Sequence, residues 1–304
     1  MALKFGIEIM NINFIQELIL TTKAQKDYEL LDSGDSEKLE RYGSRIIRRP
    51  DPQTLWKKSL SEVQWKSADA NFKKTEKNSG WISKFNTDEK WPITFGSLNF
   101  NIRLTTFKHT GLFPEQLSNW VWMSEKIKKA KRPISVLNLF GYTGGATLAC
   151  SQAGASVCHV DGSKTAITWA RENAALSRLE KNPIRWILDD AREFVKREIK
   201  RGVRYDAVIM DPPAFGHGPK KELWKIEDHF VSLFDIVQEV LNDNPLFVLI
   251  NGYASGYSSI AYENNLLELQ KKYKGILEKG ELTIEESKTG RLLPCGIFAR
   301  WAGI

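Results

Sequence analysis

The second half of the chain alternates short apolar segments with longer amphipathic ones, and this alternation limits the possible folds most strongly. The apolar segments have the length of buried strands, and those between them have helical spacing. Five strands are predicted at residues 134–140, 156–160, 184–188, 205–210 and 246–250, with helices at residues 146–153, 164–179, 191–201 and 233–241. Strands and helices that alternate in this order form a parallel sheet covered by helices on both faces.

The rest of the chain predicts an antiparallel end to this parallel sheet. A helix is predicted at residues 262–277, followed by two strands at 281–286 and 297–301. A further helix, at residues 116–129, lies in a lead-in segment of residues 107–130. We therefore expect an α/β fold in residues 107–304, with a doubly wound, mostly parallel seven-stranded sheet that ends in a C-terminal antiparallel hairpin.

Residues 1–106 have a different character, which predicts an N-terminal arm and a small β-rich module. Strict alternation of apolar and polar residues predicts a hairpin of residues 91–95 and 98–102. Turn residues and prolines break up the rest of the module. Turns are expected at residues 31–35 and 49–52, a polar loop at Lys73 to Ser79, and an edge strand or short arm around Phe5, Ile7 and Ile9.

Composition excludes several classes of protein. No apolar run approaches the roughly 20 residues of a membrane-spanning helix, and the first residues lack the pattern of a signal peptide. Three widely spaced cysteines suit neither a disulfide framework nor a metal site. We therefore expect a cytoplasmic protein without a metal. The net charge of +7 favours an anionic partner such as RNA, although an ordinary basic enzyme is equally compatible with it.

The strongest site signal is the stretch VLNLFGYTGGA, residues 136–146, in which a buried strand runs into a glycine-containing turn and a helix. Glycine lets the backbone approach a ligand closely. The order G-x-x-G-G differs from the G-x-G-x-x-G of dinucleotide sites, which bind a pyrophosphate. With Asn138, Tyr142 and Thr143 as polar contacts, the turn suits a ligand with a zwitterionic amino-acid tail better than a diphosphate.

Acidic residues end the next two strands, where parallel sheets bind ligands. Asp161 follows the glycine turn by about 20 residues, at the place where an acid accepts hydrogen bonds from two ribose hydroxyls. Asp190 stands directly before a helix and can accept a hydrogen bond from an adenine amino group. Each acid alone is equally compatible with a role as a helix N-cap.

The fourth strand is followed by Asp211-Pro212-Pro213-Ala214-Phe215. The Asp211 carboxylate and a backbone carbonyl held by Pro212 can accept hydrogen bonds from an exocyclic amine. The Phe215 ring can stack on a base that has left its helix. The other interpretation is that two prolines simply end a strand, because proline cannot donate to the ladder.

These motifs resemble the class I S-adenosylmethionine-dependent methyltransferases that include bacterial 23S ribosomal RNA methyltransferases. The similar stretches are residues 137–147, 160–163, 170–173, 189–191 and 211–215, and an upstream segment, residues 107–116, that resembles the T-G-x-F-x-x-Q segment of the family. Residues 31–35, 38–41 and 49–53 are similar to a branch whose substrates are unassigned.

The resemblance implies S-adenosylmethionine as the cofactor and assigns residues to it. The implied methionine-binding residues are Asn138, Phe140, Gly141, Tyr142, Thr143 and Gly144; the ribose-binding ones are Asp161 and Ser163; and Asp190 takes the adenine. Gly111 and Gln116 join from the lead-in segment, and Asp211 contacts the cofactor besides acting with Pro212 and Phe215 in catalysis. Asn173 is expected to support the site from its helix.

The sequence departs from the branch of the family that methylates carbon 5 of cytosine, which needs a cysteine thiolate. Residues 251–255, after the fifth strand, hold Asn-Gly-Tyr-Ala-Ser instead. Cys150 and Cys158 fall in a predicted helix and strand, and Cys295 is the only thiol predicted to lie in a loop. Direct transfer to a base in RNA, with ribosomal RNA and a nitrogen acceptor preferred, is therefore the leading hypothesis.

Three other hypotheses remain open at this point. The chain is also compatible with a methyltransferase that acts on a protein or a small molecule. It is compatible with an RNA-binding protein that keeps the fold without turnover. A nicotinamide-dependent dehydrogenase is disfavoured, because the glycine pattern differs. The sequence makes no prediction about the oligomeric state.

Overall fold

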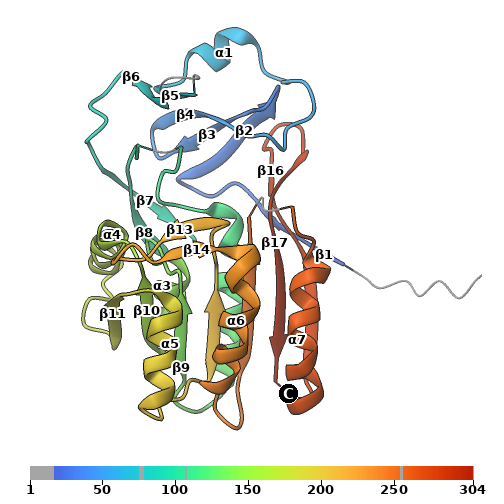
Figure 1. Ribbon diagram of the computed structural model, residues 1–304. Coiled ribbons are helices and arrows are strands. Elements are labelled where there is room, and N and C mark those ends of the chain that lie inside the picture. The colour runs from blue at the N-terminus through green and yellow to red at the C-terminus, as the bar shows by residue number, and fades with distance from the viewer. Residues whose placement is uncertain (1–16, 75–78, 107, 254–255, 304) are drawn as a thin grey trace, which may run out of the picture.

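The computed structural model describes residues 17–74, 79–106, 108–253 and 256–303, and its centre is an eight-stranded sheet (Figure 1). The strand order is β1-β16-β17-β15-β12-β9-β10-β11, and only β17 runs opposite to its neighbours. The strands are β1 (Leu18–Thr22), β9 (Ser135–Leu139), β10 (Ser156–Asp161), β11 (Ile184–Leu188), β12 (Ala207–Met210), β15 (Phe247–Gly252), β16 (Ile276–Glu285) and β17 (Leu292–Ala302). The expected doubly wound sheet with a C-terminal antiparallel hairpin is confirmed.

The sheet has one strand more than the seven expected, because β1 adds to its edge. This strand pairs in parallel with β16, from Leu18 opposite Gly280 to Thr22 opposite Ile284. A Cβ at position 280 would lie 1.7 Å from the carbonyl oxygen of Leu18, so glycine is required for this close approach. The edge strand or arm expected around Phe5, Ile7 and Ile9 lies outside the described residues.

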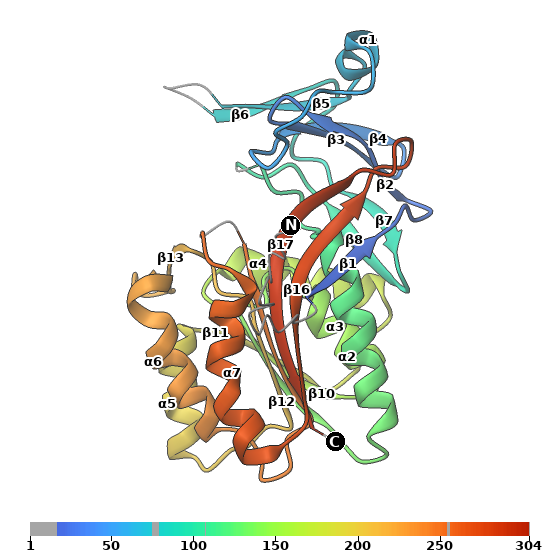
Figure 2. The same cartoon turned by 90° about the vertical axis from the view of Figure 1, so that its right-hand side faces the viewer.

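Helices cover both faces of the sheet, and each face has its own apolar core (Figure 2). One face carries α2 (Leu117–Lys129), α3 (Gly145–Gln152) and α4 (Lys164–Leu176). The other carries α5 (Ala191–Lys200), α6 (Ile226–Glu239) and α7 (Ser259–Tyr273). Strands between two such cores are apolar throughout, which explains the short apolar runs in the sequence.

Several element boundaries differ from the expected ones, most of all in α6, α7 and the C-terminal hairpin. Helix α6 begins at Ile226 rather than at residue 233. Helix α7 ends at Tyr273 because Lys274 and Gly275 have positive φ angles, 60° and 94°, and the apolar residues beyond them begin β16. Strand β17 begins at Leu292, five residues before the expected start at 297.

The N-terminal module is a five-stranded sheet with the order β2-β3-β4-β5-β6. Its elements are β2 (Tyr28–Gly34), β3 (Glu37–Tyr42), β4 (Arg45–Pro50), α1 (Glu62–Lys66), β5 (Ala70–Lys74) and β6 (Ser79–Ser83). The polar segment expected as a loop is partly strand, since Lys73 pairs with Gly80 and Ser79 begins β6, while residues 75–78 lie outside the described residues. The turn expected at residues 31–35 begins later, at Asp35 and Ser36, because β2 continues to Gly34.

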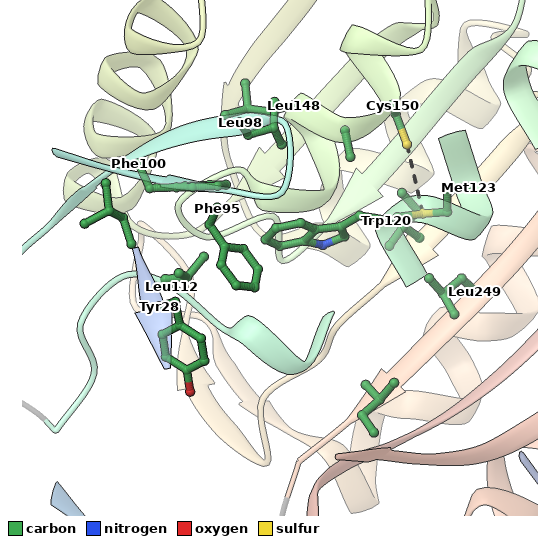
Figure 3. Packing of buried hydrophobic residues seen from close by; sticks show 14 of the residues in the cluster. Tyr28, Phe95, Leu98, Phe100, Leu112, Trp120, Met123, Leu148, Cys150 and Leu249 are labelled. Carbon is green, nitrogen blue, oxygen red and sulfur yellow. Dashed lines mark hydrogen bonds between the residues drawn. The ribbon is translucent and has the colours of Figure 1, made fainter. Parts of the chain in front are cut away.

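A hairpin of β7 (Trp91–Phe95) and β8 (Leu98–Ile102) follows the module and has the residues expected from the sequence. It packs against α2 through Trp120, whose ring centroid lies 6.0 Å from that of Phe95 and 5.7 Å from that of Phe100 (Figure 3). The same indole closes over the first residue of α3, where a Cβ on Gly145 would lie 2.2 Å from it. Trp120 therefore joins the hairpin, α2 and the glycine turn.

The tip of the β16–β17 hairpin is tied to the module through Asp32 on β2. This fully buried carboxylate accepts hydrogen bonds from the backbone N–H groups of Ser59 and Leu60, the indole of Trp65 and, at 2.9 Å, the guanidinium of Arg291. Arg291 stands directly before β17 and also pairs with Glu286. The module is thus held to the main sheet by a charged network whose two carboxylates, those of Asp32 and Glu286, are fully buried.

Replacement of Asp32 by alanine is expected to destabilise the fold strongly. The change leaves Arg291 without one of its two carboxylates and three N–H donors without an acceptor, and breaking a buried ion pair costs about 3–5 kcal/mol. Urea unfolding measures the loss, with Asp35→Asn as the control, because the Asp35–Lys57 pair is solvent-exposed. Equal midpoint urea concentrations for the two variants would contradict the role given to Asp32.

Candidate active site

A cavity of about 790 Å³ lies at the carboxyl ends of the central strands and reaches the module. Most of the predicted site residues line it: Gly111, Gln116, Asn138, Phe140, Gly141, Tyr142, Thr143, Asp161, Ser163, Asp190, Asp211 and Pro212. Gly144 and Phe215 are not among its lining residues. The far wall comes from the module and includes Lys38, Arg49 and Asp51. The sequence motifs therefore converge on one site, opposite residues that they did not predict.

The glycine turn between β9 and α3 has an unusual backbone. Phe140 and Tyr142 have φ angles of 58° and 47°. Residues other than glycine adopt such positive φ angles only at an energetic cost. Between them, a Cβ on Gly141 would lie 2.5 Å from the ring of buried His159. Gly144 has a φ of 91° and is the residue from which α3 begins. Gly144 thus shapes the turn from behind, whereas residues 140–143 face the cavity.

The lead-in segment is fastened to this turn. The Thr143 hydroxyl donates to the Gly111 carbonyl at 2.5 Å, and the Asn173 side-chain amide donates to the Thr143 carbonyl at 2.9 Å. The other side of Asn173 accepts the backbone N–H of Asn101, at 2.9 Å. Gly111 has a φ of 91°, and a Cβ there would lie 2.0 Å from the Trp169 ring. Asn173 thus lies where a supporting residue is expected.

Asp161 ends β10 with its carboxylate on the cavity wall. One oxygen accepts the backbone N–H of Tyr142 and the other that of Ser163, each at 2.8 Å. The residue that caps α4 is Ser163, whose hydroxyl accepts the Ala166 N–H. Asp161 is therefore not a helix cap. Its carboxylate has lone pairs left for a ligand, and burial raises its pKa despite the two backbone donors.

Asp190, by contrast, is the N-cap of α5. Its side chain accepts the backbone N–H groups of Arg192 and Glu193 and pairs with the Arg192 guanidinium. The alternative that the sequence left open, a capping role, thus describes what this carboxylate does in the structure. Asp190 also lines the cavity beside Asp189, and its contact with an adenine stays a prediction.

Asp211 follows β12 and lies beside a second carboxyl group, that of Glu115. Burial and, to a smaller extent, the nearby Glu115 carboxyl group raise the pKa of Asp211 to about 7. Burial also raises the pKa of Glu115, which is 4% exposed. The Tyr253 hydroxyl interacts with Glu115 and accepts a hydrogen bond from Gln116 at 2.9 Å. Near neutral pH, the site thus holds a carboxyl group that is poised between its two protonation states.

Phe215 lies at the entrance to the site rather than inside it. It begins β13 (Phe215–His217), which pairs with β14 (Leu223–Lys225), and its ring is 58% exposed. The next two residues in the chain, Gly216 and His217, line the cavity. Stacking of this ring on a base therefore stays a prediction, with the contact at the rim.

Cys295 is in a strand, not in the loop expected from the sequence. It is the extra residue of a β-bulge in β17, where the pairing with β16 shifts between Gly296 and Pro294, and it lines the cavity. Burial and the nearby Glu115 raise the pKa of its thiol. Burial also raises the pKa values of Cys150 and of Cys158, the latter to about 11. All three thiols are therefore protonated at neutral pH.

Several cavity residues had not been singled out from the sequence: Lys38, Lys108, Glu115 and Tyr253. Glu115 directly precedes Gln116 in the lead-in segment, so the motif itself could have drawn attention to it. Tyr253 belongs to residues 251–255, which were considered only for the cysteine that they lack; Ala254 and Ser255 lie outside the described residues. Lys38 lies on β3, in the stretch of residues 38–41 that resembles the branch with unassigned substrates, and that resemblance implied no role for it.

Among the residues that the structure describes, the helices are too short or too polar to span a membrane. No group of three or more His, Cys, Asp or Glu side chains in the same part of the chain is arranged to hold a metal ion.

Comparison with known families identifies the cofactor. The family model for S-adenosylmethionine-dependent methyltransferases matches residues 65–263, which is more than half of the chain. The chain belongs to this family. Its cofactor is S-adenosylmethionine. The glycine turn and the acid at the end of β10 both line the cavity described above.

Individual relatives support the same class of enzyme. A SAM-dependent methyltransferase from Agrobacterium tumefaciens has a similar structure, with a TM-score of 0.90, 39% identity and 94% of each chain covered. A protein described as a methyltransferase and solved with SAH shares the fold, with a TM-score of 0.66, 16% identity, and 91% of this chain and 75% of that one covered.

A curated relative comes from Shewanella sp. (strain MR-4) and is named ribosomal RNA large subunit methyltransferase K/L. It is 30% identical over 155 residues, which make up 50% of this chain and 21% of the relative. The chain thus spans about a fifth of the length of this relative.

The raised pKa of Asp211 predicts a pH-dependent cost to stability. A carboxyl group whose pKa is higher in the folded state than in the unfolded chain favours folding most below the unfolded value, near 4, and this benefit is lost as the pH rises to about 7. Asp211→Asn should therefore gain melting temperature over the parent between pH 4 and 7, and the gain should level off above pH 7. A pH-independent difference in differential scanning fluorimetry would contradict the shift.

Proposed function

We propose that this methyltransferase transfers the methyl group of S-adenosylmethionine directly to a base in RNA, with ribosomal RNA favoured and a nitrogen atom as the acceptor. The observation that carries the proposal is the position of Asp211-Pro212-Pro213 in the same cavity as the glycine turn and Asp161. The curated relatives named for ribosomal RNA and the net charge of +7 support an RNA substrate. A cytoplasmic location is part of the same proposal.

On the cofactor side, the proposed contacts follow the positions of the side chains. Residues 138–143 would hold the methionine part, with Gly144 shaping the turn. Asp161 and Ser163 would hold the ribose, and Asp190 or its neighbour Asp189 would take the adenine. Gly111 and Gln116 would close the site from the lead-in segment. The cofactor supplies an electrophilic methyl group on a sulfonium ion.

On the substrate side, Asp211 is the group that orients the acceptor. Its ionised carboxylate, together with a backbone carbonyl held by Pro212, accepts N–H donors of a planar amine, so that the nitrogen lone pair faces the methyl group. Positioning of this kind supplies most of the acceleration in a direct displacement. Because the pKa of Asp211 is about 7, the acceptor form is populated as the pH rises through neutrality.

Direct transfer also agrees with the protonation state of the cysteine thiols. A covalent route requires a thiolate that attacks the base, whereas burial keeps the pKa of Cys295 above its ordinary value. The nearby Glu115 carboxyl group contributes to this rise in pKa and so disfavours a thiolate at Cys295. A protein or small-molecule substrate remains the alternative, because the cavity itself does not select for RNA.

Purified protein incubated with labelled cofactor and separate pools of RNA, protein and metabolites tests the proposal. Label is expected in RNA. Asp211→Asn should lower turnover by at least ~10²-fold with most cofactor affinity retained, which is the lower range for the loss of one positioned polar group. Cys295→Ser should leave turnover nearly unchanged.

Other outcomes would redirect the assignment. Label found only in protein or metabolites would replace RNA as the substrate. An inactive Cys295→Ser enzyme, or a protein–RNA adduct trapped with a mechanism-based cytosine analogue, would point to covalent catalysis.

A further inference from the structure

The module, together with Lys108 and His109 of the adjoining lead-in segment, forms a wall of the cavity with more positive than negative charge. Three cations line it, Lys38, Arg49 and Lys108. Lys38 pairs with Asp51 at 3.1 Å, and Arg49 forms a buried pair with Glu40 at 2.6 Å. Two carboxylates thus face three cations. Glu115 also lines the cavity, and burial raises its pKa, which disfavours its charged form.

Lys108 is the cation that remains without a carboxylate partner among the described residues. Its amino group donates only to the Pro50 carbonyl, over a long 3.4 Å. Burial lowers its pKa, as do the neighbouring Lys38 and Arg49, while Asp51 opposes them. A half-buried ammonium group without a carboxylate pays for desolvation without a matching attraction, so it is suited to a ligand that brings the negative charge.

The backbone around Lys108 is held firmly by the module. The Arg49 guanidinium donates to the Lys108 carbonyl at 3.0 Å, and the Thr105 hydroxyl donates to the carbonyl of the next residue, His109, at 2.9 Å. The His109 ring packs against Phe113 with 5.4 Å between the ring centroids and also lines the cavity. A pKa of about 4, caused by burial and then by Arg49, Lys108 and Lys38, keeps this imidazole neutral. A neutral imidazole adds an N–H donor to the wall without adding charge.

We propose that Lys108, flanked by Lys38 and His109, forms an anion subsite that binds a phosphate group of the substrate across the cavity from Asp211. The assignment of that phosphate to a phosphodiester beside the target nucleotide rests on the proposed function. The subsite itself requires only a phosphorylated substrate. One phosphate fixed on the module and one base fixed at Asp211 would set the orientation of the nucleotide between them.

Equilibrium binding to the full-length protein saturated with SAH tests the subsite, with a nucleoside and its 5′-monophosphate as probes. The parent protein should bind the monophosphate at least about ten-fold more tightly than the nucleoside, because hydrogen bonds to charged groups are the stronger ones. Equal affinities in the parent would overturn the subsite without reference to any variant.

Two variants test whether the phosphate binds at Lys108. Lys108→Met keeps the apolar stem and should remove the preference for the monophosphate, whereas Lys57→Met, on an exposed lysine of the module, should not. For a short single-stranded RNA, Lys108→Met should reduce the slope of log affinity against log salt by about 0.7, the value for one phosphate contact. An unchanged slope and an unchanged preference would contradict the role of Lys108.

The same measurements separate this proposal from the RNA proposal. If the preference for the monophosphate depends on Lys108 but RNA is not methylated, the subsite stands and its ligand is a small phosphorylated substrate. The opposite outcome is also informative. If Lys108→Met still methylates RNA and binds the short RNA with the affinity and the salt slope of the parent protein, the RNA proposal stands and the subsite is rejected.

Discussion

The site depends on one constraint of the main sheet: the chain leaves the neighbouring strands β9 and β12 toward opposite faces. After β9 it enters α3 on one face, and after β12 it passes through β13 and β14 to α6 on the other. The two connections diverge, and a crevice is left at the carboxyl ends where they separate. The glycine turn and Asp211 begin these two connections, so the cofactor and substrate sides of the cavity meet there.

The second wall of the cavity requires contacts between segments that are far apart in the chain. The long hairpin of β16 and β17 rises from the main sheet to the module (Figure 2), where Glu286 and Arg291 bind Ser33 and Asp32. Trp120 fastens the β7–β8 hairpin from the other side. These contacts hold Lys38 and Lys108 opposite the strand ends. Catalysis by positioning needs such rigidity, since small displacements of a bound reactant are costly in rate.

The sequence predicted those parts of the site that depend on local patterns. Strand periodicity, glycines in the turn after β9 and an acid at the end of β10 are visible within about 30 residues, and the structure brings them together. Other parts depend on distant pairing. Strand β1 pairs with β16 at the far end of the chain, which is possible because Gly280 lets the two backbones approach, and nothing near Leu18 indicates this partner. The bulge at Cys295 also becomes visible only through the register of β16 and β17. Likewise, Asp190 could be a ligand or a helix cap on sequence grounds, and only the structure shows the hydrogen bonds with which it caps α5.

Isothermal titration calorimetry of the full-length protein tests most directly whether this cavity is built for S-adenosylmethionine. Both the cofactor and its demethylated product should bind in the micromolar range, and NAD should give no measurable heat. Asp161→Ala should weaken binding of the product by more than the ~1 kcal/mol of an ordinary hydrogen bond, because two ribose hydroxyls lose a charged acceptor. Binding of NAD in preference to S-adenosylmethionine would contradict the account. An Asp161→Ala protein that melts earlier but binds the product like the parent would contradict it as well.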